Sequence, residues 1–210
     1  MGKLVLVRHG QSIWNKKGLW TGRTDIDLTE EGREEARKAG EALKHISFVI
    51  AYTAPLIRTR HTLDEIKNIL TDTSFPDYIT PALTERDYGD LTGKNKWNVE
   101  KKYGEKQFLA WRRGWDTPPP NGESLKDVYQ RVVPFYENDV LPRLKENENV
   151  LVVSSGNELR ALIKHIEDIS DKDIVHTEIK TGEVWEYDIN HDGGMVKKKI
   201  LVANTNSEKQ

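Results

Sequence analysis

The sequence predicts an α/β fold with three layers, in which helices cover both faces of a mainly parallel sheet. Three observations support this prediction. Short apolar segments alternate with segments of helical periodicity at both ends of the chain. These apolar segments are hydrophobic at almost every position, which is typical of parallel strands covered on both faces. A chain of 210 residues is also long enough to build one such core.

The N-terminal half is expected to contain two strand–helix pairs. Residues 3–7 (KLVLV) predict a first buried strand. Thr29 is a candidate N-cap for a helix with acidic residues in its first turn and apolar residues along one face. Residues 48–52 (FVIAY) predict a second buried strand, and Pro55 can begin the helix that follows it.

The C-terminal part continues the alternation of strands and helices. Residues 150–153 (VLVV) predict a third buried strand, and residues 158–166 predict the helix after it. A later strand is expected at residues 184–189. The charged segment 191–210 is expected to be a frayed C-terminal tail.

The middle of the chain, residues 76–125, differs from both ends. It holds three tryptophans, two clusters of basic and aromatic side chains and the run PPPNG. We interpret it as a helical cap or lid inserted over the sheet rather than as a separate domain. The predicted organisation is therefore one domain, residues 1–190, followed by the tail.

Composition excludes several classes of function. The absence of cysteine excludes disulfides, thiolate nucleophiles and cysteine-based metal sites. The 32 basic and 34 acidic side chains nearly balance, which argues against nucleic-acid binding but still permits a local arginine cluster around a small anion. No apolar run is long enough for a signal peptide or a membrane span. We expect a cytoplasmic enzyme with a small-molecule substrate and no nucleic-acid or membrane partner.

The tripeptide Arg8-His9-Gly10 stands where the first predicted strand ends. Ligands of open α/β sheets bind beyond the carboxyl ends of the strands, so this is a natural position for a functional histidine. His9 can serve there as nucleophile, general base or metal ligand, and the planar fork of Arg8 suits an anionic oxygen. By itself, a histidine after a strand is more often structural.

Five further groups of residues are candidates for the same site. Polar residues soon after His9 can line an oxyanion pocket, or merely cap a polar loop. Arg58 near a helix start favours a bound phosphate, although an exposed helix arginine explains it equally well. Glu85 is a candidate general acid if a closed pocket raises its pKa. The basic residues of the cap and the turn after the third strand complete the set: Lys96, Arg112, Arg113, Ser154, Ser155, Gly156 and Asn157.

Taken in order, these segments resemble the cofactor-dependent phosphoglycerate mutases of the histidine phosphatase superfamily. The matching stretches are LVRHGQSIWN, TGRTDIDLTEEGREEA, YTAPLIRT, LTERDYGDLTGKNK, KYGEKQFLAWRRGWDTPPPNGESL and SSGNELRALI. They extend from the N-terminus to about residue 190. RHG occurs across the superfamily, whereas WRR, PPPNGESL and GNxLRAL together indicate the mutase branch.

The resemblance implies a phosphoenzyme mechanism that interconverts 3-phosphoglycerate and 2-phosphoglycerate. His9 would carry the phosphoryl group, Arg8 and Arg58 would clamp it, and Glu85 would exchange the substrate proton. The family charges its histidine from 2,3-bisphosphoglycerate and needs no metal, so we expect no metal here. The residues expected to bind substrate are Gln11, Ser12, Asn15, Thr21, Gly22, Arg86, Tyr88, Lys96, Arg112, Arg113, Gly156 and Asn157.

One position departs from the family. The family has a second catalytic histidine in an HGN triplet, and this chain has Ser155 there. A serine hydroxyl cannot carry positive charge, so its presence predicts a rate lower by roughly 10²–10³. His165 is a possible substitute, although we expect it to face elsewhere.

Two alternatives therefore stay open at this stage: a phosphatase of the same superfamily, or a catalytically weak phosphoglycerate-binding protein. The sequence leaves monomer and homodimer equally open.

Overall fold

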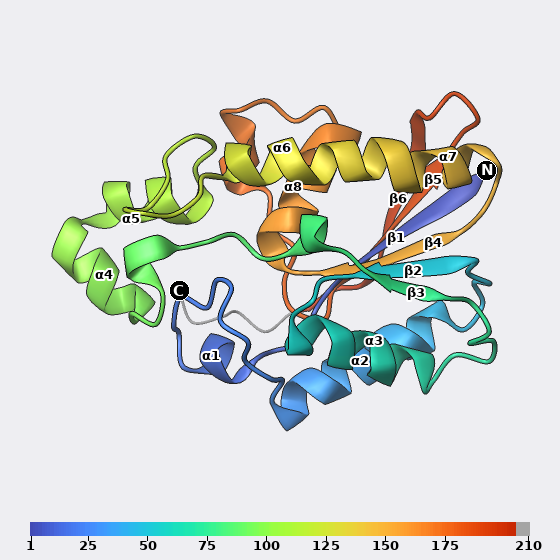
Figure 1. Ribbon diagram of the computed structural model, residues 1–210, viewed down its shortest axis with the longest axis horizontal. Coiled ribbons are helices and arrows are strands. Elements are labelled where there is room, and N and C mark those ends of the chain that lie inside the picture. The colour runs from blue at the N-terminus through green and yellow to red at the C-terminus, as the bar shows by residue number, and fades with distance from the viewer. Residues whose placement is uncertain (205–210) are drawn as a thin grey trace.

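The computed structural model describes residues 1–204 and confirms the predicted α/β fold (Figure 1). Six strands form one sheet in the order β3-β2-β4-β1-β5-β6. Their bounds are β1 Gly2–Arg8, β2 Ile50–Thr53, β3 Asp77–Ile79, β4 Val150–Ser154, β5 Val184–Ile189 and β6 Met195–Val202. The strands β1 to β4 are mutually parallel, and β5 and β6 are added antiparallel at one edge.

Helices connect the strands and cover the sheet. The α-helices are α1 Ile13–Lys16, α2 Glu30–Leu43, α3 Ile57–Lys67, α4 Lys96–Tyr103, α5 Glu105–Arg113, α6 Leu125–Phe135, α7 Leu141–Lys145 and α8 Gly156–Ile166. Short 3₁₀ turns lie at η1 Pro81–Leu83, η2 Gly89–Leu91 and η4 Asp173–His176, and a π-helical turn, η3 Tyr136–Val140, joins α6 to α7. Thr29 caps α2 as predicted, because its hydroxyl accepts a hydrogen bond from the Gly32 amide.

The three layers follow from the pleat of the strands. Successive side chains of a strand point to opposite faces, so Leu4 and Leu6 belong to one apolar cluster while Val5 and Val7 belong to the other. Helices α2 and α3 pack together over the Val5 face, and α6, α7 and α8 cover the Leu4 face (Figure 1). The uniformly apolar strands that suggested burial on both faces are therefore explained by this packing.

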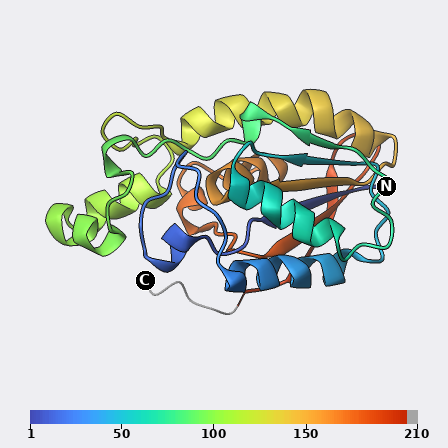
Figure 2. The same ribbon diagram turned by 60° about the horizontal axis from the view of Figure 1, so that its bottom comes forward.

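A smaller lobe lies beyond the carboxyl ends of the parallel strands. It consists mainly of α4 and α5 with the adjoining turns, and both views show it projecting from one end of the sheet (Figures 1 and 2). Its own apolar cluster is Trp20, Leu91, Val99, Phe108 and Trp111. Within the segment 76–125, residues Asp77–Ile79 form strand β3 at the sheet edge and are not part of this lobe.

The expectation of a frayed tail is wrong for residues 195–202. They form β6, which pairs antiparallel with β5. The lysines that suggested a solvated tail have partners in the fold: Lys198 Nζ lies 2.7 Å from Glu167 Oε1 and Lys199 Nζ lies 3.2 Å from Glu186 Oε1. A charged edge strand is compatible with solubility because it discourages pairing with another sheet edge. The last part of the expected tail, residues 205–210, lies outside the described residues.

Within residues 1–204, no helix combines the length and apolar character needed to cross a bilayer.

Candidate active site

The candidate nucleophile, His9, lies directly after β1 and is almost completely buried. Its backbone amide donates to the Ser154 carbonyl at 3.0 Å, which ties it to the end of β4. Its ring Nδ1 lies 2.7 Å from the Gly10 carbonyl oxygen. Because a carbonyl only accepts, Nδ1 must carry the proton, and Nε2 is left with a lone pair. Burial, together with the charges of Arg58 and Arg8, holds the pKa of His9 well below its usual value, so the ring is neutral at neutral pH.

Gly10 allows a close approach between the loop after His9 and helix α2. A Cβ added to Gly10 would lie 2.0 Å from the carbonyl oxygen of Gly32, and one added to Gly32 would lie 2.2 Å from that of Gln11. The loop after His9 and the first turn of α2 are thus in backbone contact, which only glycine permits. This backbone contact holds the loop that follows His9 against α2.

A pocket of about 650 Å³, including the space open to solvent, lies in front of His9 between the sheet and the α4–α5 lobe. Most of the residues expected from the sequence meet there. Those that line it are Arg8, His9, Asn15, Thr21, Glu85, Tyr88, Lys96, Arg112, Arg113, Gly156 and Asn157. Segments that lie up to about 150 positions apart in the chain therefore converge on one cavity.

Glu85 is held in the pocket by its neighbours. Its Oε1 accepts hydrogen bonds from the Arg86 amide at 2.7 Å and from Asn157 Nδ2 at 2.9 Å. The same Nδ2 lies 2.8 Å from the Tyr88 hydroxyl. Arg160 Nη1 donates to Asn157 Oδ1 at 3.2 Å, and because a guanidinium only donates, this contact fixes which way the amide points. Asn157 therefore presents its NH₂ group to Glu85.

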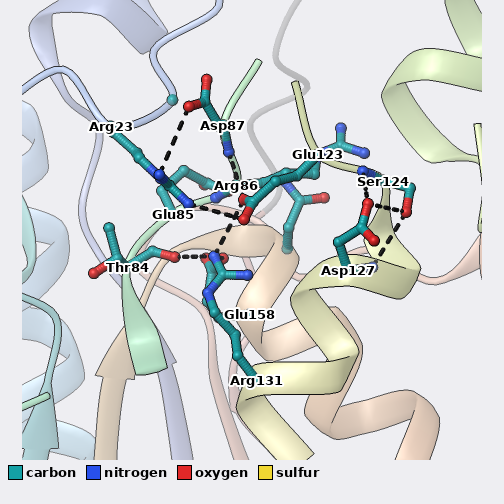
Figure 3. A network of polar contacts seen from close by, with 12 residues as sticks. Arg23, Thr84, Glu85, Arg86, Asp87, Glu123, Ser124, Asp127, Arg131 and Glu158 are labelled. Carbon is teal, nitrogen blue, oxygen red and sulfur yellow. Dashed lines mark hydrogen bonds and ion pairs between the residues drawn. The ribbon is translucent and has the colours of Figure 1, made fainter. Parts of the chain in front are cut away.

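A second carboxyl, that of Glu158, lies near Glu85. Glu158, in the first turn of α8, is fully buried, and Arg131 Nη2 lies 3.3 Å from its Oε1 (Figure 3). Within the described residues its Oε2 has no hydrogen-bond partner. Burial and the nearby charge of Glu85 raise the pKa of Glu158 well above its usual value, against the attraction of Arg131. Burial in the fold therefore favours the protonated form of Glu158.

Of the two arginines expected to clamp the phosphoryl group, Arg8 lines the pocket and Arg58 does not. The Arg8 guanidinium reaches the pocket, where its Nη1 donates to the Ile179 carbonyl at 2.9 Å. Arg58 is buried outside the pocket lining, and its Nη1 and Nη2 donate to the carbonyls of Thr24 and Gly22 at 3.0 and 2.9 Å. It thus holds the loop that carries Thr21, in which Gly22 has a positive φ of 54°.

Several other expected residues support the site from outside the lining. Ser12 caps α1 through its hydroxyl, and the Gln11 amide donates to Glu35 Oε2 at 2.8 Å. Arg86 is fully buried, and its Nη2 donates to the Trp111 carbonyl at 2.8 Å while its guanidinium lies 4.7 Å from the centre of the Tyr88 ring. Arg86 therefore fixes the end of α5 that presents Arg112 and Arg113.

A model of the histidine phosphatase superfamily (branch 1) matches residues 4–200. The chain belongs to this superfamily. It is 48% identical over 202 residues to a 2,3-bisphosphoglycerate-dependent phosphoglycerate mutase of Nitrobacter winogradskyi, covering 95% of this chain and 98% of the relative. A relative of the same name from Bradyrhizobium diazoefficiens is 49% identical over the same coverage. The resemblance to the phosphoglycerate mutases is confirmed, and the chain is an enzyme.

Solved structures of the superfamily share the fold. The alpha-ribazole phosphatase of Shigella flexneri superimposes with a TM-score of 0.77 at 28% identity, covering 93% of this chain and 94% of that one. A mycobacterial glucosyl-3-phosphoglycerate phosphatase gives a TM-score of 0.79 at 21% identity, covering 95% and 98%. At that identity the second comparison is evidence for the fold alone.

Ser155, where the mutase family has its second histidine, lies beside the nucleophile in the strand register. Arg8 pairs with Ser154 across β1 and β4, so His9 and Ser155 are the residues that directly follow these two strands. The Ser155 side chain is fully buried, its Oγ has no hydrogen-bond partner in residues 1–204, and it does not line the pocket. His165 cannot replace the missing histidine, because its ring contacts the Tyr129 hydroxyl and faces Glu137 instead.

The sequence did not identify Arg160 and Glu178, which also line the pocket of this superfamily member. Arg160 could have been found, because it lies three residues after Asn157 and hence on the same face of α8. Burial and the charges of Arg113 and Arg86 lower its pKa to about 9, which leaves it charged at neutral pH. Glu178 lies in a loop after η4 that carries no motif. Within the described residues no group of three or more histidine or acidic side chains is arranged to bind a metal ion.

Proposed function

We propose that this enzyme interconverts 3-phosphoglycerate and 2-phosphoglycerate through a phosphohistidine at His9. The observation that carries the proposal is the pairing of a neutral, buried His9 with Glu85 across one cationic pocket. A nucleophile and a proton-exchanging acid are the two groups that a phosphoryl transfer between hydroxyls requires. The identity of about 48% to phosphoglycerate mutases over nearly the whole chain supports the same reaction.

The tautomer of His9 suits the transfer. The Nε2 lone pair attacks one phosphorus of 2,3-bisphosphoglycerate, an N–P bond forms, and the ester P–O bond breaks with its electron pair leaving on the glycerate oxygen. Glu85 gives that oxygen a proton, which leaves a phosphoglycerate and the phosphohistidine. In the opposite step, the free hydroxyl of a phosphoglycerate passes its proton to Glu85 as its oxygen attacks the phosphohistidine and the N–P bond breaks, which forms the bisphosphate again. Positioning and charge neutralisation supply most of the rate in such transfers.

The positive charge of the pocket is divided between two ends. Arg8 lies at the nucleophile, while Lys96, Arg112 and Arg113 come from the α4–α5 lobe. A phosphoglycerate carries a phosphate at one end and a carboxylate at the other, so this arrangement can hold both.

The same donors fit 2,3-bisphosphoglycerate, which has two phosphates and a carboxylate. Arg8 and the charged residues of the lobe supply side chains for more than one anionic group. Gly156 lines the pocket beside the Arg8 guanidinium, since a Cβ there would be in van der Waals contact with Arg8 Nε at 3.4 Å. When bound, this compound supplies the phosphoryl group that charges His9.

We further propose that Ser155 slows the reaction. A histidine at this position can share the charge that develops on the transferred phosphoryl oxygens, whereas a serine hydroxyl offers at most one neutral hydrogen bond. Losing one such charge-stabilising contact typically lowers kcat by roughly 10²–10³.

Phosphorus NMR tests the proposal directly. Purified enzyme is incubated with 3-phosphoglycerate, with and without trace 2,3-bisphosphoglycerate, beside the variants His9→Ala and Ser155→His. We expect 2-phosphoglycerate to appear faster with the bisphosphate, to be absent with His9→Ala and to increase with Ser155→His. No isomer from either the wild type or Ser155→His would contradict the proposal.

A phosphatase is the second candidate, supported by the superposition on the alpha-ribazole phosphatase of Shigella flexneri at 28% identity. In that reaction water attacks the phosphohistidine. Release of inorganic phosphate without isomerisation in the same NMR experiment would identify it.

A further inference from the structure

The cationic pocket contains an acidic residue that the proposed mechanism does not use. Glu178 lines the cavity together with Arg8, Arg112 and Arg113. One of its carboxylate oxygens forms an ion pair with Arg113 Nη2. The Glu178 side chain is about one-third exposed (34%), so this ion pair faces the space that a substrate would enter.

The loop that carries Glu178 is tied to the pocket on both sides of this residue. Arg160 Nε donates to the Thr177 carbonyl at 2.9 Å, and Arg8 Nη1 donates to the Ile179 carbonyl at 2.9 Å. Two arginines of the pocket thus hold the backbone immediately before and after Glu178. The carboxylate is therefore a fixed component of the pocket rather than a surface side chain that happens to reach it.

The electrostatic surroundings keep this carboxylate charged. Burial on its own would raise the pKa of Glu178, but the charges of Arg113, Arg8 and Arg112 lower it below the usual value. Glu178 consequently places a full negative charge among the cations that would bind the substrate. A second anion that approaches Arg113 is repelled by this charge across a short distance.

We infer that Glu178 is a built-in counter-ion of Arg113, which the remote anionic group of the substrate must displace. The inference rests on the proposed function, since it concerns the affinity of the same pocket for a phosphoglycerate. Displacement costs the Arg113–Glu178 ion pair and leaves Glu178 to be solvated, so it weakens binding. Glu178 thereby sets the affinity for ligands with a charged group at both ends and speeds their release.

The opposite role, in which Glu178 merely orients Arg113 for the substrate, makes the opposite prediction. If Glu178 orients Arg113, the variant Glu178→Gln should bind phosphoglycerate more weakly than the wild type. If Glu178 competes with the substrate, the same variant should bind it more tightly.

Calorimetric titration with 3-phosphoglycerate separates the two roles. The proteins are the wild type, Glu178→Gln and a control, Glu148→Gln, which removes the carboxylate of an ion pair with Arg143 (3.2 Å) that does not line the pocket. We expect the dissociation constant to fall roughly two- to fivefold in Glu178→Gln, the range typical of a partly exposed ion pair. The control should match the wild type, and thermal unfolding of each protein verifies that it is folded.

The wild-type titration also separates this inference from the proposed function. An equal or larger dissociation constant in Glu178→Gln overturns the inference and leaves the proposed function intact. If 3-phosphoglycerate binds neither protein, the proposed function fails and the inference fails with it. Tighter binding by Glu178→Gln supports both.

Discussion

Replacing the buried Glu158 by glutamine should make the protein more stable, and increasingly so as the pH rises. Burial raises the pKa of Glu158 well above its ordinary value of 4.5, so above this pH the unfolded chain loses the proton more readily than the folded protein does. A group with a raised folded-state pKa contributes its full stability below the unfolded pKa. That contribution is lost as the pH rises towards the folded pKa.

The size of the effect follows from this linkage. Between the two pKa values the wild type loses about 1.4 kcal/mol of folding free energy per pH unit through this group. Glutamine has nearly the same shape and does not titrate, so the folding free energy of Glu158→Gln does not fall with pH through this group. Its Oε1 can still accept from Arg131, which lies 3.3 Å from the present carboxylate. From pH 4.5 upwards, the stability difference between variant and wild type should grow by up to about 1.4 kcal/mol per pH unit until the pH reaches the folded-state pKa.

Urea unfolding of both proteins at several pH values measures this difference. Glu148→Gln, which alters a partly exposed carboxylate, is a suitable control and should show no comparable trend. A Glu158→Gln protein that is less stable by the same amount at every pH would refute the reasoning. It would mean that Glu158 is ionised in the fold and stabilised by Arg131.

Three further outcomes are expected. The ring of His9, whose pKa is held well below 6.5, should show no titration between pH 6 and 8 when its proton resonances are followed by NMR; a midpoint in that range would contradict its neutral state. Asn157→Asp should place a second carboxyl within hydrogen-bond distance of Glu85 and shift the acidic limb of the pH profile of kcat to higher pH. An unchanged pH profile would show that residue 157 does not influence the acid that controls kcat. Gly10→Ala should lower the free energy of unfolding by about 2 kcal/mol or more, since its Cβ would lie 2.0 Å from the Gly32 carbonyl; unchanged thermal unfolding would show that the loop can move aside.

The layered fold could be predicted because its strands are short and uniformly apolar. The run at residues 150–153 and strand β4 agree within a residue, and Thr29 caps α2 as its position indicated. Strands β3 and β6 could not be predicted in the same way. Both lie at sheet edges, where side chains are exposed and the apolar pattern disappears, so pairing with a neighbouring strand decides their conformation.

The sequence predicted correctly those pocket residues whose side chains themselves line the cavity. His9, Glu85 and Asn157 meet as their motifs indicated. The sequence was less informative about residues that act through another group. Arg58 and Arg86 carry charges suited to a substrate, yet their guanidinium groups are buried against backbone carbonyls.

Glu178 had no local signal, because its importance arises only when folding brings its loop to Arg113.

The central claim is that His9 carries the phosphoryl group, and intact-mass analysis of the phosphoenzyme tests it most directly. The enzyme is mixed with 2,3-bisphosphoglycerate, quenched at alkaline pH where phosphohistidine survives, and digested to locate the modification. We predict one phosphoryl group per chain, on His9, lost on addition of 3-phosphoglycerate and absent from His9→Ala. A phosphoryl group on another residue, or its persistence in His9→Ala, would contradict the account.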